Sequence, residues 1–210
     1  MTDEKVIALF LKTPVPGRVK TRLARDIGHH AACRVYTGLV ENIISQVVKS
    51  GIPLAICYDG EHEDLPESWL KPAQYVLRQT SGDLGRRMAA AFQALFRGGA
   101  GYVALIGSDI PGITPDYLHG AFSMMDRHAM VIGPATDGGY CLIGFRRDCF
   151  TSAVFEGISW STCRVYRMTL EAAAKADLDA AALPPLSDID SLDDLLKMTV
   201  GDGPFPHNRF

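Results

Sequence analysis

"VIALFLKTPVPGRVKTRLA" (Val6–Ala24) joins an unbroken apolar run to a segment that carries four cations, two prolines and one glycine. The apolar run lacks the polar alternation of a half-exposed strand, and turn-forming residues follow it. This pattern is typical of a strand buried on both faces, as in a parallel sheet that helices cover. The cationic segment therefore begins at the carboxyl end of a buried strand.

Similar apolar runs alternate along the chain with longer segments whose apolar residues have helical spacing. We predict five further strands, at Pro53–Tyr58, Gln74–Gln79, Tyr102–Gly107, 129–135 and 139–145. We predict helices at His29–Gly51, Gly82–Gly99, 161–177 and 191–200, one around Val19–Ile27, and one that starts at Thr114 and Pro115. Gly51 is the expected stop of its helix, and Thr114, Ser161 and Ser191 are the expected N-caps. This alternation predicts an α/β fold, with a mostly parallel sheet and helices on both faces.

Length and composition exclude several classes of protein. The 210 residues carry a net charge of −3, so the chain lacks the basic character of a nucleic-acid-binding protein. No apolar run approaches the ~20 residues that span a bilayer. The five cysteines form no CxxC pair, which argues against a zinc site and for reduced thiols in a cytoplasm. We therefore expect one cytoplasmic domain over residues 1–210, with neither nucleic acid nor membrane as a partner.

The cationic segment has the features of an anion-binding loop. It is neither a Walker loop nor a dinucleotide fingerprint, because GxxxxGK[ST] and GxGxxG are absent. It leads into an expected helix start, where backbone N–H groups favour an anion. Lys12, Arg18, Lys20 and Arg22 add positive charge; the alternative is a solvated basic surface. Because ligands of open α/β sheets bind outside the carboxyl ends of the strands, we predict a di- or triphosphate site here.

Aspartates follow a buried strand and precede the last helix. "LIGSDIPG" places Asp109 directly beyond a strand, where one carboxylate commonly holds a nucleotide-bound Mg²⁺ or Mn²⁺. The alternative for Asp109 is a cap of its turn or of the following helix. "LSDIDSLDDL" adds Asp188 and Asp190, as helix-cap acids or as further metal ligands. Asp193 and Asp194 fall in the first helical turn, where they favour the helix dipole, and we interpret them as structural.

"GPATDGGYCLIGF" and "ISWSTCR" supply candidates for an acceptor site. The two glycines permit close approach of a ligand to the backbone, or a tight turn between strands. Asp137, Gly138, Gly139 and Tyr140 therefore either line an acceptor or sugar pocket or form a plain hairpin. Trp160 is either a wall of the same pocket or an anchor in the core.

Six motifs carry a resemblance to a known family, in the order "KTPVPGRVKTRLA", "GDLGRRM", "GSDIPG", "GPATDGGYCLIGF", "WST" and "DIDSLDDL". Together they resemble the glycosyltransferase-like or 2-phospho-lactate guanylyltransferase-like family of the nucleotide-diphospho-sugar transferase (GT-A) superfamily. The resemblance covers nearly the whole chain. It implies a GT-A fold, with a nucleotide-binding half at about 1–110 and an acceptor half at about 111–210.

The resemblance also implies roles for individual residues. The phosphate loop falls on Lys12, Arg18, Lys20 and Arg22, and the catalytic residues are Lys20 and Asp109. The ligands of the cofactor, Mg²⁺ or Mn²⁺, are Asp109 and Asp190, with Asp188 as the neighbouring candidate. Gln79 and Asp83 match the region that contacts base and ribose.

Two departures from related families leave the reaction open. A lone "SD" stands where common glycosyltransferases have Asp-x-Asp, and the Gly-rich start of sugar-nucleotide synthases is missing. The family favours metal-dependent glycosyl transfer from a nucleotide sugar to a small acceptor. The alternatives are nucleotidyl transfer from a nucleoside triphosphate to a phosphorylated small molecule, and a nucleotide-binding module without catalysis. Exposed apolar residues expected on the late helices would suit a homodimer.

Overall fold

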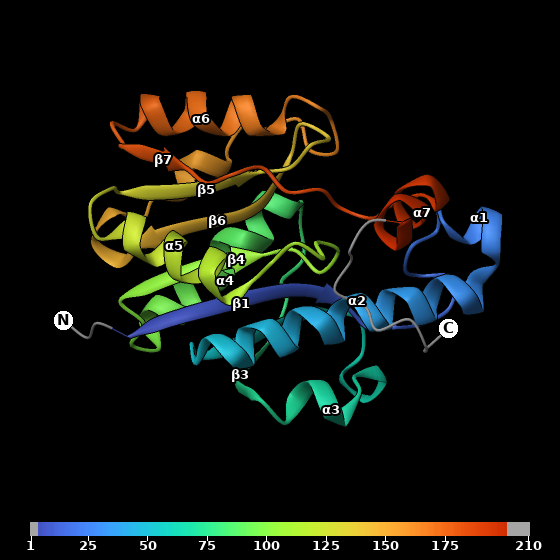
Figure 1. Ribbon diagram of the computed structural model, residues 1–210. Coiled ribbons are helices and arrows are strands. Elements are labelled where there is room, and N and C mark those ends of the chain that lie inside the picture. Colours follow the sequence, from blue (N-terminus) through green and yellow to red (C-terminus); the bar gives the residue numbers. More distant parts are fainter. Residues whose placement is uncertain (1–3, 201–210) are drawn as a thin grey trace.

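The computed structural model describes residues 4–200, whose seven strands form one sheet in the order β3-β2-β1-β4-β6-β5-β7 (Figure 1). The strands are β1 (Lys5–Lys12), β2 (Leu54–Asp59), β3 (Ala73–Arg78), β4 (Tyr102–Ile106), β5 (Met130–Pro134), β6 (Tyr140–Arg146) and β7 (Ala180–Ala182). Only β6 runs antiparallel to its neighbours, β4 and β5. The predicted α/β class with a mostly parallel sheet is therefore confirmed.

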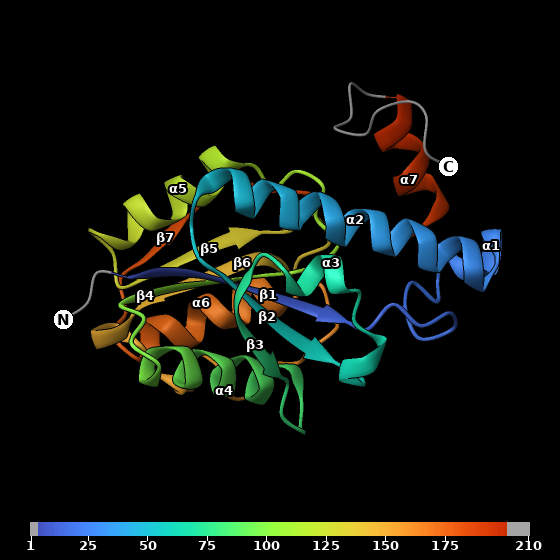
Figure 2. The same cartoon turned by 90° about the horizontal axis from the view of Figure 1, so that it is seen from below.

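Helices cover both faces of the sheet, with α2 and α5 on one side and α4 and α6 on the other (Figure 2). The helices of the described residues are α1 (Ala24–Ile27), α2 (His29–Ser50), α3 (Glu67–Leu70), α4 (Leu84–Arg97), α5 (Pro115–Met125), α6 (Val165–Lys175) and α7 (Leu192–Val200). Three short 3₁₀ turns lie at His62–Asp64, Arg147–Cys149 and Ser152–Phe155. Within residues 4–200, each helix is either too short or too polar to cross a bilayer.

The alternation of side chains along β1 explains why its apolar run is unbroken. Ile7 and Leu9 pack into the core under α2 and α5, whereas Ala8 and Phe10 pack into the core under α4 and α6. A strand in the middle of a covered sheet needs apolar residues at every position. Burying this strand on both sides also directs its last residue, Lys12, to the edge of the sheet where β2 and β4 end.

A third, smaller core holds the end of the described chain against the cationic loop. Ile189 and Leu192 pack with Leu23, Val35 and other residues of α1 and α2. In Figure 1, α7 accordingly lies beside α1, although the two helices come from opposite ends of the sequence. This packing brings the acidic segment before α7 to the carboxyl edge of the sheet.

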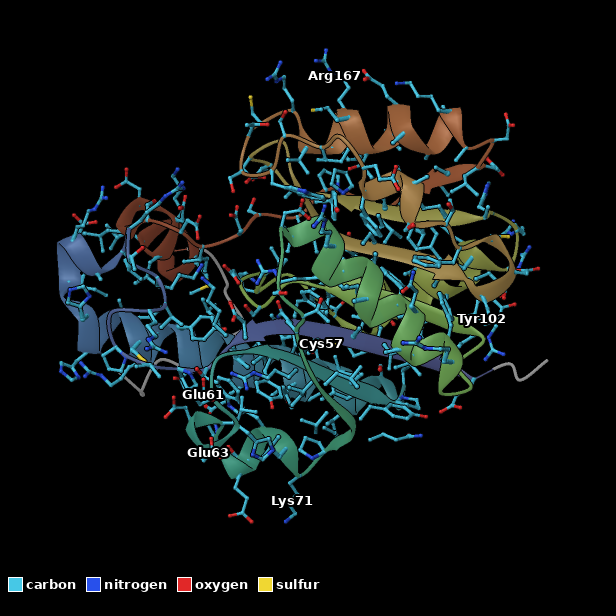
Figure 3. All side chains as sticks on the ribbon, turned by 180° about the vertical axis from the view of Figure 1, so that it is seen from behind. Cys57, Glu61, Glu63, Lys71, Tyr102 and Arg167 are labelled. Carbon is cyan, nitrogen blue, oxygen red and sulfur yellow. The ribbon has the colours of Figure 1, made fainter. Side chains whose placement is uncertain are left out.

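Charged side chains cover the outside of the fold. In the view of Figure 3, Glu61, Glu63, Lys71 and Arg167 point away from the ribbon, while Cys57 lies within the sheet. The exposed large apolar residues within 4–200 are scattered over four elements, at Val48, Val76, Leu84 and Leu196. Of these, only Leu196 lies on a late helix, and the homodimer stays a prediction.

Two of the predicted helix ends are confirmed in detail. Gly51 ends α2 in the left-handed conformation (φ 69°), which costs glycine little. Thr114 caps α5, because its side-chain oxygen accepts a hydrogen bond from the Tyr117 N–H, and Pro115 is the first helical residue. Both helix ends depend only on residues that are close together in the sequence, so the sequence alone is enough to predict them.

Two local predictions are wrong, and one strand was missed. The expected helix around Val19–Ile27 is a single turn at Ala24–Ile27, because Lys20 adopts a left-handed backbone (φ 46°) that interrupts it. Ser161 also has a positive φ (61°) and caps nothing, and α6 begins four residues later, at Val165. The strand β7 was not predicted, because its three alanines lack the residues typical of strands.

Candidate functional site

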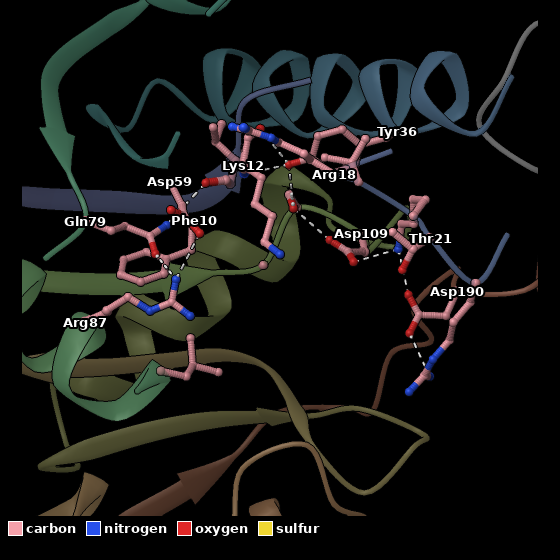
Figure 4. Close-up of a pocket in the computed structure, with 17 residues that line it drawn as sticks. Phe10, Lys12, Arg18, Thr21, Tyr36, Asp59, Gln79, Arg87, Asp109 and Asp190 are labelled. Carbon is pink, nitrogen blue, oxygen red and sulfur yellow. Dashed lines mark hydrogen bonds and ion pairs between the residues drawn. The ribbon is translucent and has the colours of Figure 1, made fainter. Parts of the chain in front are cut away.

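A cavity of about 430 Å³ opens at the carboxyl ends of β1, β2, β3 and β4 (Figure 4). Its walls come from the loop after β1, the ends of β2 and β3, the start of α4, the loop after β4, and Asp190 from the segment before α7. Cavities that hold small molecules measure ~300–1,000 Å³. The position follows the rule for open α/β sheets, because polar residues that end neighbouring parallel strands meet at one edge.

Lys20 joins two aspartates that are distant in the sequence. Its Nζ donates hydrogen bonds to Asp109 Oδ2 at 2.6 Å and to Asp190 Oδ1 at 2.8 Å. Dashed lines in Figure 4 mark both contacts, with Asp109 and Asp190 on either side of the same nitrogen. The Lys20 side chain is only 4% exposed. Burial lowers the pKa of the Lys20 ammonium, but the negative charges of Asp109 and Asp190 raise it by more than burial lowers it. The pKa therefore lies above its ordinary value, and the group is charged.

A hydrogen-bonded group of residues holds Asp109 in place beyond β4. Ser108 donates its hydroxyl proton to Asp109 Oδ1 at 2.7 Å. The Tyr36 hydroxyl, from α2, lies 3.4 Å from Ser108 Oγ and 3.1 Å from the Lys12 carbonyl oxygen, and it accepts the Lys12 N–H at 2.8 Å. Burial raises the pKa of Tyr36, so this hydroxyl stays protonated. Tyr36 thus ties the end of β1 to the residue beside Asp109.

The other predicted members of the cationic loop line the same cavity. Lys12, Arg18 and Arg22 are exposed at its walls. Arg22 Nη1 lies 3.4 Å from Asp190 Oδ2, but its side chain is 76% exposed. An exposed pair of this kind is worth ~0–1 kcal/mol, so the three exposed cations remain available to an anionic ligand.

Gln79, Arg87 and Asp59 form a second polar group, at the opposite end of the cavity from Asp190 (Figure 4). The Gln79 amide donates to the carbonyl oxygens of Leu11 (3.2 Å) and Cys57 (2.8 Å), which fixes its orientation. Its Oε1 accepts a hydrogen bond from Arg87 Nη1 at 3.0 Å, and the same nitrogen lies 3.3 Å from Asp59 Oδ2. Because the amide protons of Gln79 are already used, the Arg87 guanidinium is the donor that this end can offer to a ligand.

Asp59, Arg87, Tyr36 and Ser108 were not predicted as site residues. Asp59 is the last residue of β2, so reading the end of every strand would have found it. Arg87 stands in the motif "GDLGRRM", one turn after the N-cap of α4. Ser108 stands in the motif "GSDIPG" just beyond β4, so the strand-end rule would have found it too. Tyr36 had no comparable signal, because its role depends on how α2 packs on the sheet.

A second cavity, of about 640 Å³, adjoins the first and shares Arg22 and Asp190 with it. Asp137 and Asp188 also line it. Burial raises the pKa of Asp188, and the negative charges of Asp137 and Asp190 raise it further. Asp109 lines the first cavity and Asp188 the second, so the two side chains face different cavities.

Several predicted acceptor and base contacts lie elsewhere. Asp83 is the N-cap of α4, where it accepts the Arg86 N–H at 2.8 Å, and it lines a third cavity beside Phe155 rather than the first. Trp160 packs against the core under α4 and α6, which fits the core alternative given for it. Tyr140 packs against the same core.

The glycines after Asp137 form a tight turn between β5 and β6, which is the hairpin that we gave as the alternative to an acceptor pocket. Asp137 Oδ1 accepts the Gly139 N–H at 2.8 Å. Gly138 has φ 91°, and a Cβ added there would stand 2.2 Å from the Cys163 carbonyl oxygen. Gly138 is therefore required by backbone packing, whereas the Asp137 side chain itself lies at the second cavity.

The donor set of the first cavity fits a hard divalent cation. Within residues 4–200, no three acidic, histidine or cysteine side chains converge to form a protein-only metal site. Asp109 and Asp190 nevertheless converge on one cation, the Lys20 ammonium. Mg²⁺ is commonly held by one or two carboxylates together with phosphates of the substrate, and two converging carboxylates meet this requirement.

Comparisons with known proteins identify the family and the class of enzyme. Residues 43–162 match the family described as "Uncharacterized protein conserved in bacteria (DUF2064)". No curated protein matches the chain. A solved structure from Desulfovibrio desulfuricans G20, assigned to the nucleotide-diphospho-sugar transferases, is 38% identical with a TM-score of 0.89, and the match covers 97% of this chain and 90% of that one. This similarity places the chain among the transferases.

Two more distant structures share the fold. The inositol-1-phosphate CTP transferase of T. maritima is 16% identical with a TM-score of 0.58, and the match covers 92% of each chain. Glucosyl-3-phosphoglycerate synthase of Mycobacterium tuberculosis, solved with Mn²⁺ and UDP, is 11% identical with a TM-score of 0.53, over 92% of this chain and 75% of that one. The family match and the 38% identical structure together show that this chain belongs to the DUF2064 family, with the α/β fold of the nucleotide-diphospho-sugar transferases.

Proposed function

We propose that this chain is a divalent-cation-dependent glycosyltransferase, which moves a sugar from a nucleotide sugar to a hydroxyl of a small acceptor. The observation that carries the proposal is the meeting of the cationic loop with Asp109 and Asp190 at one cavity of nucleotide size. Four cations and two carboxylates around one space suit a diphosphate that arrives with its cation.

The proposed roles follow the positions of the side chains in the first cavity. Lys12, Arg18, Lys20 and Arg22 bind the diphosphate, because they surround its expected position with positive charge. The Gln79–Arg87–Asp59 group, at the far end, lies where the base and ribose would extend. Asp109 and Asp190 hold the divalent cation, Mg²⁺ or Mn²⁺, which when bound neutralises the leaving diphosphate.

The second cavity is the proposed acceptor site, and its charge favours glycosyl transfer. The cavity is lined by four aspartates (Asp137, Asp188, Asp190 and Asp194) and by two cations (Arg22 and Lys197), so acidic side chains outnumber basic ones. Such a wall is less favourable for a phosphate than the first cavity, and its carboxylates accept hydrogen bonds from the hydroxyls of a neutral acceptor. In the reaction, the acceptor oxygen forms the new bond to the sugar carbon. The bond from that carbon to the diphosphate breaks, its electron pair leaves with the nucleoside diphosphate, and the proton of the hydroxyl is released to water.

Nucleotidyl transfer is the second candidate, supported by the number of cations in the loop. Four cations at one cavity would also suit a triphosphate, whose α-phosphorus is attacked by an acceptor phosphate while pyrophosphate leaves. A non-catalytic nucleotide-binding module would not need Asp190 beside Asp109. The shared contact of both carboxylates with Lys20 therefore supports a catalytic site over such a module.

A binding panel followed by product analysis tests the proposal. The protein is heated with each common nucleoside diphosphate, triphosphate and nucleotide sugar, with and without Mg²⁺ or Mn²⁺. Stabilisation by a nucleotide sugar, with slow release of the nucleoside diphosphate, supports glycosyl transfer. Pyrophosphate release from a triphosphate would replace it with nucleotidyl transfer. Absence of any nucleotide-dependent shift would overturn both.

A further inference from the structure

We propose that Lys20 is a built-in counter-ion, which occupies the cation position between Asp109 and Asp190 until the phosphates of the nucleotide draw it away. The inference rests on the proposed function, because it assigns the order in which that site is filled. Its consequence is that the nucleotide-free protein binds a divalent cation weakly, and that nucleotide and cation bind together.

The geometry puts the ammonium where the metal would lie. The Nζ atom is 2.6 Å from Asp109 Oδ2 and 2.8 Å from Asp190 Oδ1. A divalent cation held by the same two oxygens would sit about 2.0–2.6 Å from each of them. The ammonium and the cation therefore exclude each other, because one space between two oxygens cannot hold both.

The backbone of Lys20 has an unusual conformation, and its side chain extends into the space between the two carboxylates. Lys20 has φ 46°, a left-handed conformation that is strained for a non-glycine residue. Its side chain is only 4% exposed, whereas that of Arg22, two residues on, is 76% exposed. The strained residue is thus the one member of the loop that reaches between the two carboxylates.

The two carboxylates stay together when the ammonium leaves. The Ile189 N–H donates a hydrogen bond to the Asp109 carbonyl oxygen at 3.1 Å, which joins the two backbones directly. Ile189 is 2% exposed and packs with Leu23 and Leu39 in the third core. Since this link is independent of Lys20, the aspartates remain side by side and ready for another cation.

The phosphates offer Lys20 an alternative set of acceptors. An ammonium group has three N–H donors and moves readily on its flexible stem. Phosphate oxygens at the cavity wall would compensate its charge as the carboxylates do, and the divalent cation would replace it between them. Binding of nucleotide and cation is then coupled, and each raises the affinity of the other by the same factor.

Direct measurement of Mn²⁺ binding to nucleotide-free protein tests the inference. Calorimetry or the electron spin resonance signal of free Mn²⁺ gives the Kd for wild type, Lys20→Met and Arg25→Met. We expect Lys20→Met to bind Mn²⁺ about tenfold more tightly than wild type. Arg25→Met removes one positive charge from an exposed position that lines neither cavity, so its Kd should stay within about twofold of wild type. Adding Asp109→Asn to Lys20→Met should abolish the gain.

The outcomes separate this inference from the proposed function. If Lys20→Met binds Mn²⁺ no more tightly than wild type, the inference is wrong. The proposed function still stands if UDP, GDP, CDP or ADP raises the Mn²⁺ affinity of wild type and Asp109→Asn removes this rise. If Mn²⁺ binding depends on Asp109 in neither setting, both are wrong. Lys20→Gln, which keeps a polar end, repeats the test should the methionine variant fail to fold by circular dichroism.

Discussion

Asp190 lies beside Asp109 because two independent contacts join the segments that carry them. The backbone N–H of Ile189 donates to the Asp109 carbonyl oxygen at 3.1 Å, and both carboxylates bind the Lys20 ammonium. The first contact is part of the main chain, while the second depends on charge. Substitutions of the side chains should therefore change binding far more than they change the fold.

Asp109→Asn should remove the metal-dependent part of any nucleotide-induced rise in Tm. The amide is a much weaker ligand for a hard cation than the carboxylate, and Asp109 is 35% exposed, so the variant should still fold. Its own Tm should fall by about 2–8 °C, because the buried Lys20 loses one partner at a cost of about 1–2 kcal/mol. Differential scanning fluorimetry with and without Mn²⁺ measures both effects.

Asp193→Asn is the matched control for this change. Asp193 is exposed in the first turn of α7, so the same loss of charge occurs away from the cavity. This variant should keep the full metal response. An equal loss of response in both variants would show that Asp109 has no special role.

Arg87→Met should weaken nucleotide binding about tenfold, which corresponds to ~1.4 kcal/mol. Arg87 supplies the free donors at the Gln79 end of the cavity, and hydrogen bonds from a charged group are worth ~1.5–3 kcal/mol. Arg86→Met removes the adjacent arginine, which is exposed and lines the third cavity instead. Calorimetric Kd values for the best nucleotide of the panel compare the two. Arg86→Met should leave the Kd unchanged, and a larger effect there than at Arg87 would contradict our assignment.

Much of this site follows from the positions at which strands end. The buried run at Val6–Leu11 predicted that the cationic loop starts at the carboxyl edge of the sheet, and the run at Tyr102–Gly107 predicted the same for Asp109. Parallel neighbours share that edge, so the two segments line one cavity. The end of β2 carries Asp59 by the same rule, and the site residue there was missed only because that strand end was not considered.

Other features depend on packing that no local pattern contains. Lys20 combines a left-handed backbone with contacts to Asp109 and Asp190, which lie far along the chain. The strand at Ala180–Ala182 exists because its backbone pairs with β5, not because alanine favours strands. Asp188 and Asp190 are two residues apart in the sequence, yet of the two only Asp190 lines the first cavity.

Ser191→Ala should destabilise the protein more at neutral than at acid pH. The pKa of Asp194 is lowered, first by the Ser191 hydroxyl, which donates to Asp194 Oδ2 at 2.6 Å, and then by backbone N–H groups. A carboxylate with a lowered folded-state pKa stabilises the protein above its ordinary value of 3.8, and this contribution is lost as the pH falls through the folded-state pKa. The difference in Tm between wild type and variant should therefore shrink as the pH falls from about 7 to about 2.5.

Ser50→Ala is the control for this pH series. The Ser50 hydroxyl donates to the Val47 carbonyl oxygen at 2.6 Å and accepts the Ile52 N–H, and neither partner titrates. Its effect on Tm should be the same at every pH. A pH-independent difference for Ser191→Ala as well would show that the hydroxyl does not act through the Asp194 carboxylate.

Gly138→Ala should lower the Tm by about 5–15 °C, because the added Cβ meets backbone rather than a movable side chain. Gly138 has φ 91°, and the Cβ would stand 2.2 Å from the Cys163 carbonyl oxygen, so strain and overlap together cost about 2–4 kcal/mol. Gly120→Ala, in α5, has open space around the new Cβ and removes a helix-weakening glycine, so its Tm should rise slightly. Thermal melts of the two variants should show changes in Tm of opposite sign if the turn after Asp137 is as tight as it is in the structure. A Gly138 variant as stable as wild type would mean that this turn, and the wall of the second cavity that it forms, is free to rearrange.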